Sequence, residues 1–165
     1  LKLNKKLAII GFKTNDYSSN TIKKNTFTHK LFVKELNINN EVYNFLGAAF
    51  LIRNNLPSSI NFFYEDLFLY CEEFYQSYKV LKKGYHIKNL NIGKLIHKSK
   101  FKKYSVYYQV RNFILIFFKE NFSFYSWNLL FFWIFKWLLK DITLIKFILS
   151  GIHDGFKKKV GQKIF

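Results

Sequence analysis

Large apolar side chains recur at helical spacing along much of the chain. Between residues 62 and 78 they mostly follow one another every three or four residues, as on one face of a helix. Residues 104–119 repeat this pattern until Lys119-Glu120-Asn121 interrupts it. The next segment, Phe124–Lys140, is apolar on most of its faces and predicts a second helix, capped by Asn121 or Ser123. A helix of this kind indicates burial among neighbouring proteins.

A shorter apolar run near the C-terminus predicts a strand. Thr143–Leu149 is partly β-branched and ends at Ser150-Gly151, as a buried strand would. The segment Gly151–Gly155 is expected to form a turn framed by its two glycines. The predicted fold class is therefore α+β, predominantly helical, with a C-terminal strand and an extended basic N-terminal arm.

The chain is expected to contain three regions. Residues 1–40 carry eight lysines and little sustained periodicity, so they predict a basic extended arm. This arm is either a solvated tail or a segment that orders along RNA on binding. Residues 41–103 predict a helical region with a basic connector, and residues 104–165 a C-terminal α/β segment that binds RNA.

The net charge points to a polyanionic partner. The 165 residues hold 27 Lys and Arg against 10 Asp and Glu, a formal charge of +17. Such self-repulsion favours binding to nucleic acid or to an anionic membrane surface. Only Arg53 and Arg111 are arginine, and lysine suits phosphate contacts better than the reading of base edges. Abundant Phe, Tyr, Ile, Asn and Lys are also typical of an AT-rich, organellar genome, which predicts a mitochondrial protein.

The segment Phe122–Leu139 raises the alternative of a membrane-embedded accessory subunit of an organellar respiratory complex. It is 18 residues long and mostly apolar, close to the length of a transmembrane helix. Lys136 lies one turn from its end, where its side chain can reach an interface. The aromatic residues are spread along the segment rather than gathered at its two ends, which favours burial in protein.

Catalytic and metal-binding patterns are weak. Cys71 is the only cysteine, and the four histidines lie in separate basic or loop contexts. Four acidic residues between 65 and 73 are better explained as a solvated helix face than as a metal or acid–base site. We therefore expect no enzymatic activity, no metal and no cofactor.

The C-terminal third resembles a ribosomal protein family. Ile145-Lys146-Phe147-Ile148-Leu149-Ser150-Gly151, followed by Gly155 and basic residues, is similar to the I-K-I-x-V-S-G-R-L-x-G strand of small-subunit ribosomal protein number three. That KH-domain protein lies where mRNA enters the small subunit. The tail Gly151–Lys157 also resembles, more weakly, the G-x-H-x-G motif of small-subunit ribosomal protein number two.

The resemblance to protein number three covers only residues 106–163 and departs from the family in several places. Ile152 replaces the arginine after Ser-Gly, and Tyr125 and Ser126 stand where the family has a basic pair. No G-x-x-G loop occurs, and the family's later strands do not follow. The resemblance thus implies a divergent, organelle-encoded and split protein, whose remaining strands come from a second chain at the Leu144–Gly151 edge.

Together, these observations predict a structural constituent of the small subunit of a mitochondrial ribosome, in the matrix. Its expected partners are ribosomal RNA and neighbouring ribosomal proteins, with a membrane as the lesser alternative. Phosphate contact is expected from two lysine groups, and close backbone approach to RNA from two glycines. The predicted RNA-binding residues are Gly151, His153, Gly155, Lys157, Lys158, Lys159 and Lys163, with Lys98, Lys100, Lys102 and Lys103 as a second basic patch.

Overall fold

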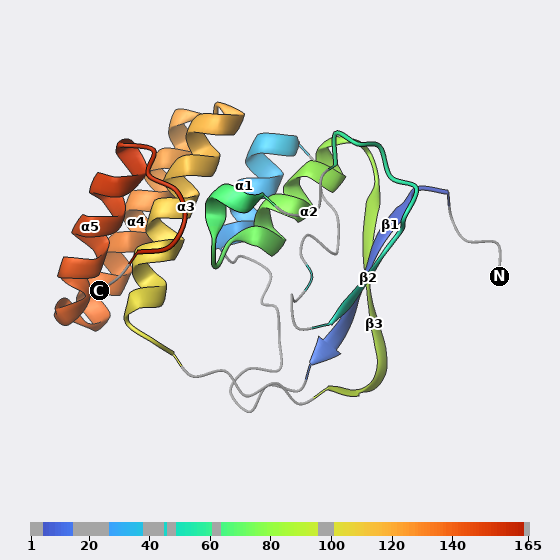
Figure 1. Ribbon diagram of the computed structural model, residues 1–165, viewed down its shortest axis with the longest axis horizontal. Helices are drawn as coiled ribbons and strands as arrows, with labels where there is room; N and C mark the ends of the chain where they lie inside the picture. The colour runs from blue at the N-terminus through green and yellow to red at the C-terminus, as the bar shows by residue number, and fades with distance from the viewer. Residues whose placement is uncertain are drawn as a thin grey trace. The chain divides into compact units, whose positions relative to one another are not determined.

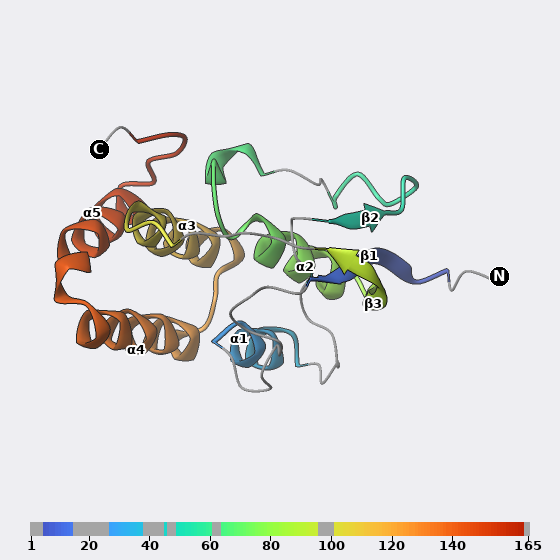
Figure 2. The same cartoon turned by 90° about the horizontal axis from the view of Figure 1, so that it is seen from below.

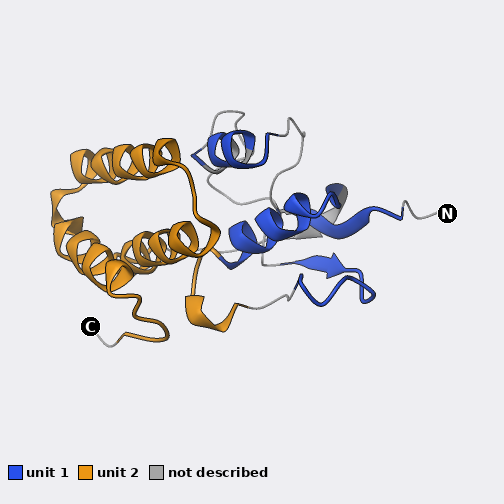
Figure 3. Ribbon diagram, turned by 90° about the horizontal axis from the view of Figure 1, so that it is seen from above, with its two compact units in different colours: residues 1–63, 72–99 blue, residues 64–71, 100–165 orange. Residues whose placement is uncertain are grey.

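The computed structural model divides the chain into two compact units, coloured separately in Figure 3. Unit 1 comprises Leu1–Phe63 and Glu72–Ser99, and unit 2 comprises Tyr64–Cys71 and Lys100–Phe165. The residues that the structure describes are 5–14, 27–37, 45, 49–60, 64–95 and 101–163.

Unit 1 is a small α+β unit around a three-stranded sheet (Figure 1). Strand β1 (Leu7–Thr14) lies in the middle of the sheet, antiparallel to β2 (Phe50–Ile52) and parallel to β3 (His86–Leu95). Helix α2 (Glu72–Lys82) packs against β3 and also contacts α1 (Phe27–Leu36). Because β1 and β3 are parallel, the chain must cross over between them, and α2 completes that connection.

The apolar residues of β1 explain its central position. Ala8 and Ile9 are buried, and Ile9 lies opposite Ile52 on one side and Ile87 on the other. A strand with neighbours on both edges satisfies its backbone hydrogen bonds within the sheet.

The predicted extended arm over residues 1–40 is wrong for its described part, because that part contains β1 and α1. The basic connector predicted before residue 104 likewise contains β3. In both places lysines and asparagines interrupt the apolar pattern, so the sequence shows no clear periodicity. The strands form because they pair with one another across the sheet, which local periodicity does not show.

Unit 2 is built on three helices, α3 (Tyr104–Glu120), α4 (Phe124–Lys140) and α5 (Ile145–Phe156). Two short 3-10 helices accompany them, η1 (Glu65–Leu67) and η2 (Ile142–Leu144). Helix α3 is the core of the unit, since most of its residues from Ser105 to Phe117 are buried. In Figure 2 a short loop leads from α3 to α4, and the far end of α4 leads into α5, which lies beside α3.

The two longest predicted helices are confirmed. Helix α3 ends at Asn121, whose left-handed backbone (φ 52°, ψ 51°) lets its N–H bond the carbonyl of Phe117. Ser123 is the extended residue that precedes α4. The Lys119-Glu120-Asn121 interruption therefore separates the two helices, as its sequence indicates.

The predicted C-terminal strand is wrong. Its residues form η2 and the first turns of α5, and the glycine-framed turn from Gly151 to Gly155 is the second half of that helix. The side chain of Asp141 accepts the N–H of Thr143 and so starts the helical turn. Since Leu144–Gly151 is not a strand, it offers no edge for strands of a second chain.

Among the helices of the described residues, none combines the length and the apolar character that crossing a membrane requires.

Candidate nucleic-acid interface

Helix α5 packs closely along α3 because two glycines face that helix. A Cβ atom on Gly151 would lie 2.8 Å from the carbonyl oxygen of Tyr107, and one on Gly155 would lie 2.9 Å from Cβ of Ile114. Both glycines are buried. Their predicted role in backbone approach to RNA is therefore wrong, since they serve the contact between the two helices.

Asp154, on the same face of α5, is the centre of a buried charged cluster. Its carboxylate is 2% exposed and accepts a hydrogen bond from the Tyr107 hydroxyl at 3.0 Å. Lys163 Nζ lies 2.8 Å from one carboxylate oxygen, and Lys159 Nζ and His153 Nδ1 each lie 3.0 Å from the other. The negative charge thus has several partners, as a buried carboxylate requires.

The cluster changes the acidity of its members. Burial by itself raises the pKa of the Asp154 carboxyl, but the hydrogen bonds from Lys163, Lys159, His153 and Tyr107 outweigh burial and hold that pKa well below 3.8. Burial and the hydrogen bond to Asp154 raise the pKa of Tyr107 from 10.0 to about 12, against the opposing effect of Arg111. Asp154 is therefore ionised, and Tyr107 neutral, throughout the physiological range.

Arg111 is a second buried charge, and it joins three segments of unit 2. It is 1% exposed and donates to the carbonyls of Gly161 at 2.6 Å and Leu67 at 3.0 Å. Its guanidinium carbon also lies 5.0 Å from the ring centre of Tyr108. Asn112 donates to the carbonyl of Leu67 as well, at 2.8 Å. The side chains of α3 therefore hold both the η1 segment and the C-terminal tail.

The tail after α5 runs back along α3. Lys158 lies near Phe118, Gly161 accepts from Arg111, and the backbone N–H of Lys163 donates to the Tyr108 hydroxyl at 2.9 Å. The successive partners thus lie at ever earlier positions in α3. Lys163 also donates to Ser150 Oγ, so the end of the tail is fixed to both α3 and α5.

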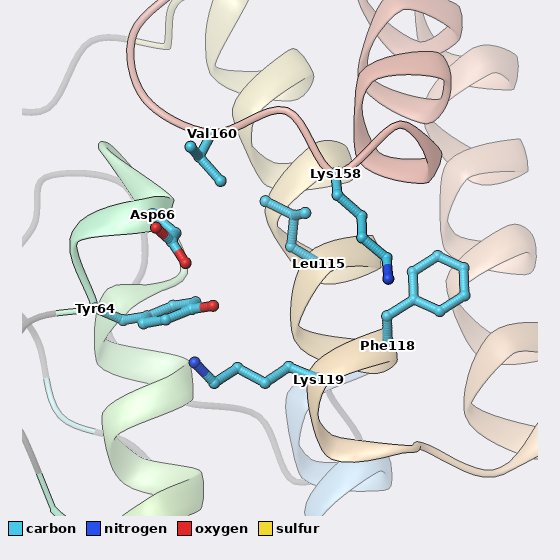
Figure 4. A pocket seen from close by; sticks show the side chains of 7 residues that line it. All are labelled: Tyr64, Asp66, Leu115, Phe118, Lys119, Lys158 and Val160. Carbon is cyan, nitrogen blue, oxygen red and sulfur yellow. The ribbon is translucent and has the colours of Figure 1, made fainter.

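A recess of about 260 Å³ opens where η1, the end of α3 and the tail meet (Figure 4). Lys119 Nζ lies 3.5 Å from the ring centre of Tyr64, and Lys158 Nζ lies 5.9 Å from that of Phe118. Burial raises the pKa of the Tyr64 hydroxyl above its usual range, and its hydrogen bond with Asp66 adds to this effect. The complete lining is Tyr64, Asp66, Leu115, Phe118, Lys119, Lys158 and Val160.

This recess presents two ammonium groups beside two aromatic rings, with the Asp66 carboxylate in the same lining. Ammonium groups neutralise phosphates and aromatic rings stack on bases, and here Lys119 lies over the ring of Tyr64. Lys119 and Lys158 lie far apart in the sequence but line the same opening. The arrangement suits a phosphate-bearing, unpaired nucleotide.

The predicted lysines have different surroundings in the structure. Lys157 and Lys158 are exposed at the end of α5, whereas Lys159 and Lys163 are bound to Asp154. His153 is exposed beside Asp154. Lys159 and Lys163 help to hold the tail through Asp154. To contact an RNA phosphate, as predicted, each would have to share its ammonium group with that carboxylate.

The second predicted patch lies at the other end of α3. Lys102 and Lys103 are exposed just before this helix, and Lys103 pairs with Asp141 at 3.4 Å. Lys98 and Lys100 lie outside the described residues. A helix of 17 residues is about 25 Å long, so Lys158, which lies near Phe118, is at the opposite end of α3 from Lys103. The tail, by contrast, returns Lys163 to Tyr108 in the second turn of α3.

Several residues of this interface were missed by reasoning from sequence. In the sequence Lys119 belongs to the interruption between two predicted helices, and Tyr64 carries no local pattern that marks it. The Gly151-x-x-x-Gly155 spacing was available as a signal, because small residues four apart allow close helix packing.

Within the part of the chain that the structure describes, no group of three or more His, Cys, Asp or Glu side chains could hold a metal ion. Comparison of the chain with models of known families, with curated proteins and with solved structures finds no match.

Proposed function

We propose that the chain is an RNA-binding structural constituent of the small subunit of a mitochondrial ribosome. The observation that carries this proposal is the convergence of Lys119 and Lys158 on one recess with aromatic walls, in a chain of net charge +17. Lysine ammonium groups supply the sequence-independent part of RNA affinity, and the rings accept bases from single-stranded loops. Lys157, exposed next to Lys158, extends the basic surface.

The chemistry favours binding over catalysis. The buried charged groups Asp154 and Arg111 are occupied by structural hydrogen bonds and ion pairs, which leaves neither directed into the recess. A ribosomal protein that stabilises RNA needs exposed cations on a rigid support, and α3 with its tail provides that support.

The place in the small subunit, where mRNA enters, rests on the family resemblance. The residues that carry this resemblance, from Ile145 to Gly155, lie in α5 rather than in a strand. The assignment to the small subunit therefore needs a test that does not depend on the resemblance.

A sucrose gradient of native organelle lysate, probed for this chain, is that test. Co-sedimentation with small-subunit RNA supports the proposal, and a position only at the top of the gradient, or with membranes that lack ribosomal RNA, contradicts it.

The recess itself is tested by the salt dependence of RNA binding. With the full chain and a single-stranded RNA oligonucleotide, Lys119→Gln/Lys158→Gln should lower the slope of log affinity against log salt by about 1.4, since each phosphate contact contributes roughly 0.7. The matched control is Lys136→Gln/Lys140→Gln, which removes the same charge from exposed positions of α4. Equal slopes for the two double variants would show that only net charge matters, and would remove the recess from the interface.

A further inference from the structure

Helix α4 presents an apolar face that the rest of unit 2 leaves uncovered. Phe124, Phe131, Phe135 and Leu139 follow one another at seven- and four-residue steps, so they form one row along the helix. Phe124 is 80% exposed and Leu139 is 72% exposed. The opposite side of the helix is buried through Ser126, Leu130 and Ile134.

Lysines border this row on one flank. Phe132, Lys136 and Lys140 lie four residues apart and form the neighbouring row, with Lys136 Nζ 4.8 Å from the ring centre of Phe132. Helix α4 contains no acidic residue. Asp141, which follows it, is bound to Lys103 and Thr143. Apart from the exposed Asn128, which lies in the same row, the face is therefore apolar in its middle and positive at its edge.

We infer that α4 is a membrane-docking helix that lies flat on an anionic phospholipid surface. In that position the phenylalanine row enters the boundary between headgroups and acyl chains, and Lys136 and Lys140 extend to the lipid phosphates. Charge complementarity selects this occupant. The two lysines lie on one flank of the row and not between its rings, which matches a bilayer surface, where phosphates lie above an apolar layer, better than an RNA strand, where phosphates and bases alternate. A second copy of the chain would bring together two molecules of net charge +17.

This inference is independent of the RNA recess, because it uses different residues. It also differs from a membrane-spanning arrangement, since the opposite side of α4 packs against α3: Trp127 lies 5.3 Å from the ring centre of Phe117, and Trp133 lies 5.7 Å from that of Phe113.

Flotation and a tryptophan placed in the phenylalanine row test the inference. The three native tryptophans, Trp127, Trp133 and Trp137, lie on α4 but outside that row, so Phe135→Trp places a fluorophore in the row itself. Full-length protein is mixed with vesicles of phosphatidylcholine containing phosphatidylglycerol or with vesicles of phosphatidylcholine alone. Binding is measured by flotation, and depth by quenching of tryptophan fluorescence by brominated acyl chains. We expect flotation with the anionic vesicles, and stronger quenching of Phe135→Trp than of wild type.

Two double variants separate the apolar and the electrostatic contributions. Phe131→Ser/Phe135→Ser should lower the partition coefficient at least about tenfold, because two rings no longer enter the bilayer. The control Phe101→Ser changes an exposed phenylalanine outside α4 and should have no such effect. Lys136→Gln/Lys140→Gln should weaken binding to anionic vesicles by roughly tenfold or more without altering RNA affinity.

Circular dichroism confirms that each variant keeps its helical content, so that loss of binding is not loss of folding. The inference is overturned if wild-type protein does not float with anionic vesicles, or if Phe135→Trp floats but is quenched no more than wild type. It is equally overturned if the folded Phe131→Ser/Phe135→Ser variant binds as well as wild type. Pull-down of a protein partner by α4, with no vesicle binding, would assign the face to a protein neighbour instead.

Discussion

The contact between α3 and α5 predicts that Gly151→Ala destabilises the chain, although alanine is the better helix former. A methyl group at this position would lie 2.8 Å from the carbonyl oxygen of Tyr107 and 3.1 Å from Cβ of Val110. Ordinary contact begins near 3.4 Å, so the helices must move apart by about 0.6 Å along the line to the carbonyl. A backbone oxygen within a helix cannot rotate away as a side chain can.

The expected loss is the balance of two opposing effects. Overpacking costs about 1–3 kcal/mol, and here it falls toward the upper end because backbone must shift. Replacing a helical glycine by alanine recovers about 1 kcal/mol. We therefore expect the free energy of unfolding to fall by about 1–2 kcal/mol, which corresponds to a decrease in Tm of about 3–8 °C for a chain of this length.

Thermal unfolding of the full chain, followed by circular dichroism, measures this loss. The control is Leu149→Ala on the same helix, whose exposed side chain should change stability by less than about 0.5 kcal/mol. If Gly151→Ala unfolds at the wild-type temperature or above it, the two helices are not held at this close distance, and the packing role of Gly151 is refuted.

The two buried charges give further predictions. Because the folded pKa of Asp154 lies below its unfolded value of 3.8, its stabilisation is complete above that value and is lost as pH falls below it. Asp154→Asn should therefore lower stability by about 2–3 kcal/mol at pH 7 and flatten the acid limb of a pH–stability curve; an unchanged limb would contradict the assignment. Arg111→Met should cost about 2–4 kcal/mol and speed tryptic cleavage near Lys157. Arg53→Met, which changes an arginine of unit 1 that donates to the carbonyl of Lys5, should not speed this cleavage. Equal cleavage rates would show that Arg111 does not hold the tail.

The helices α3 and α4 could be predicted from sequence because each has an uninterrupted apolar pattern and a clear stop between them. The segment after Asp141 could not, since a run of seven apolar residues fits a buried strand and a buried helix equally well. This segment is helical because Asp141 caps its first turn and because Gly151 and Gly155 let it pack closely against α3. The packing role of the glycines cannot be recognised until the position of α3 is known.

The strands of unit 1 were missed for a related reason. Residues of β3 such as Lys88 and Asn89 are polar on both faces, and their pairing with β1 connects segments about 80 residues apart. Local pattern carries no information on a partner at that distance, so a lysine-rich segment resembles a connector until its neighbour is known.

The lysine-rich tail of the sequence indicated Lys157 and Lys158 as phosphate contacts, but it did not indicate Lys119 or show which of the tail lysines are held by other side chains. Lys157, Lys158 and Lys159 are equivalent in sequence, yet only Lys159 has its ammonium on Asp154. The difference arises because the tail turns back along α3 and passes the buried carboxylate. RNA phosphate near Lys159 would compete with Asp154 for the same ammonium, whereas Lys163 is more firmly held through Asp154, Ser150 and Tyr108. If the chain binds RNA as proposed, Lys119, Lys157 and Lys158 can contact phosphate without breaking a buried ion pair of the fold.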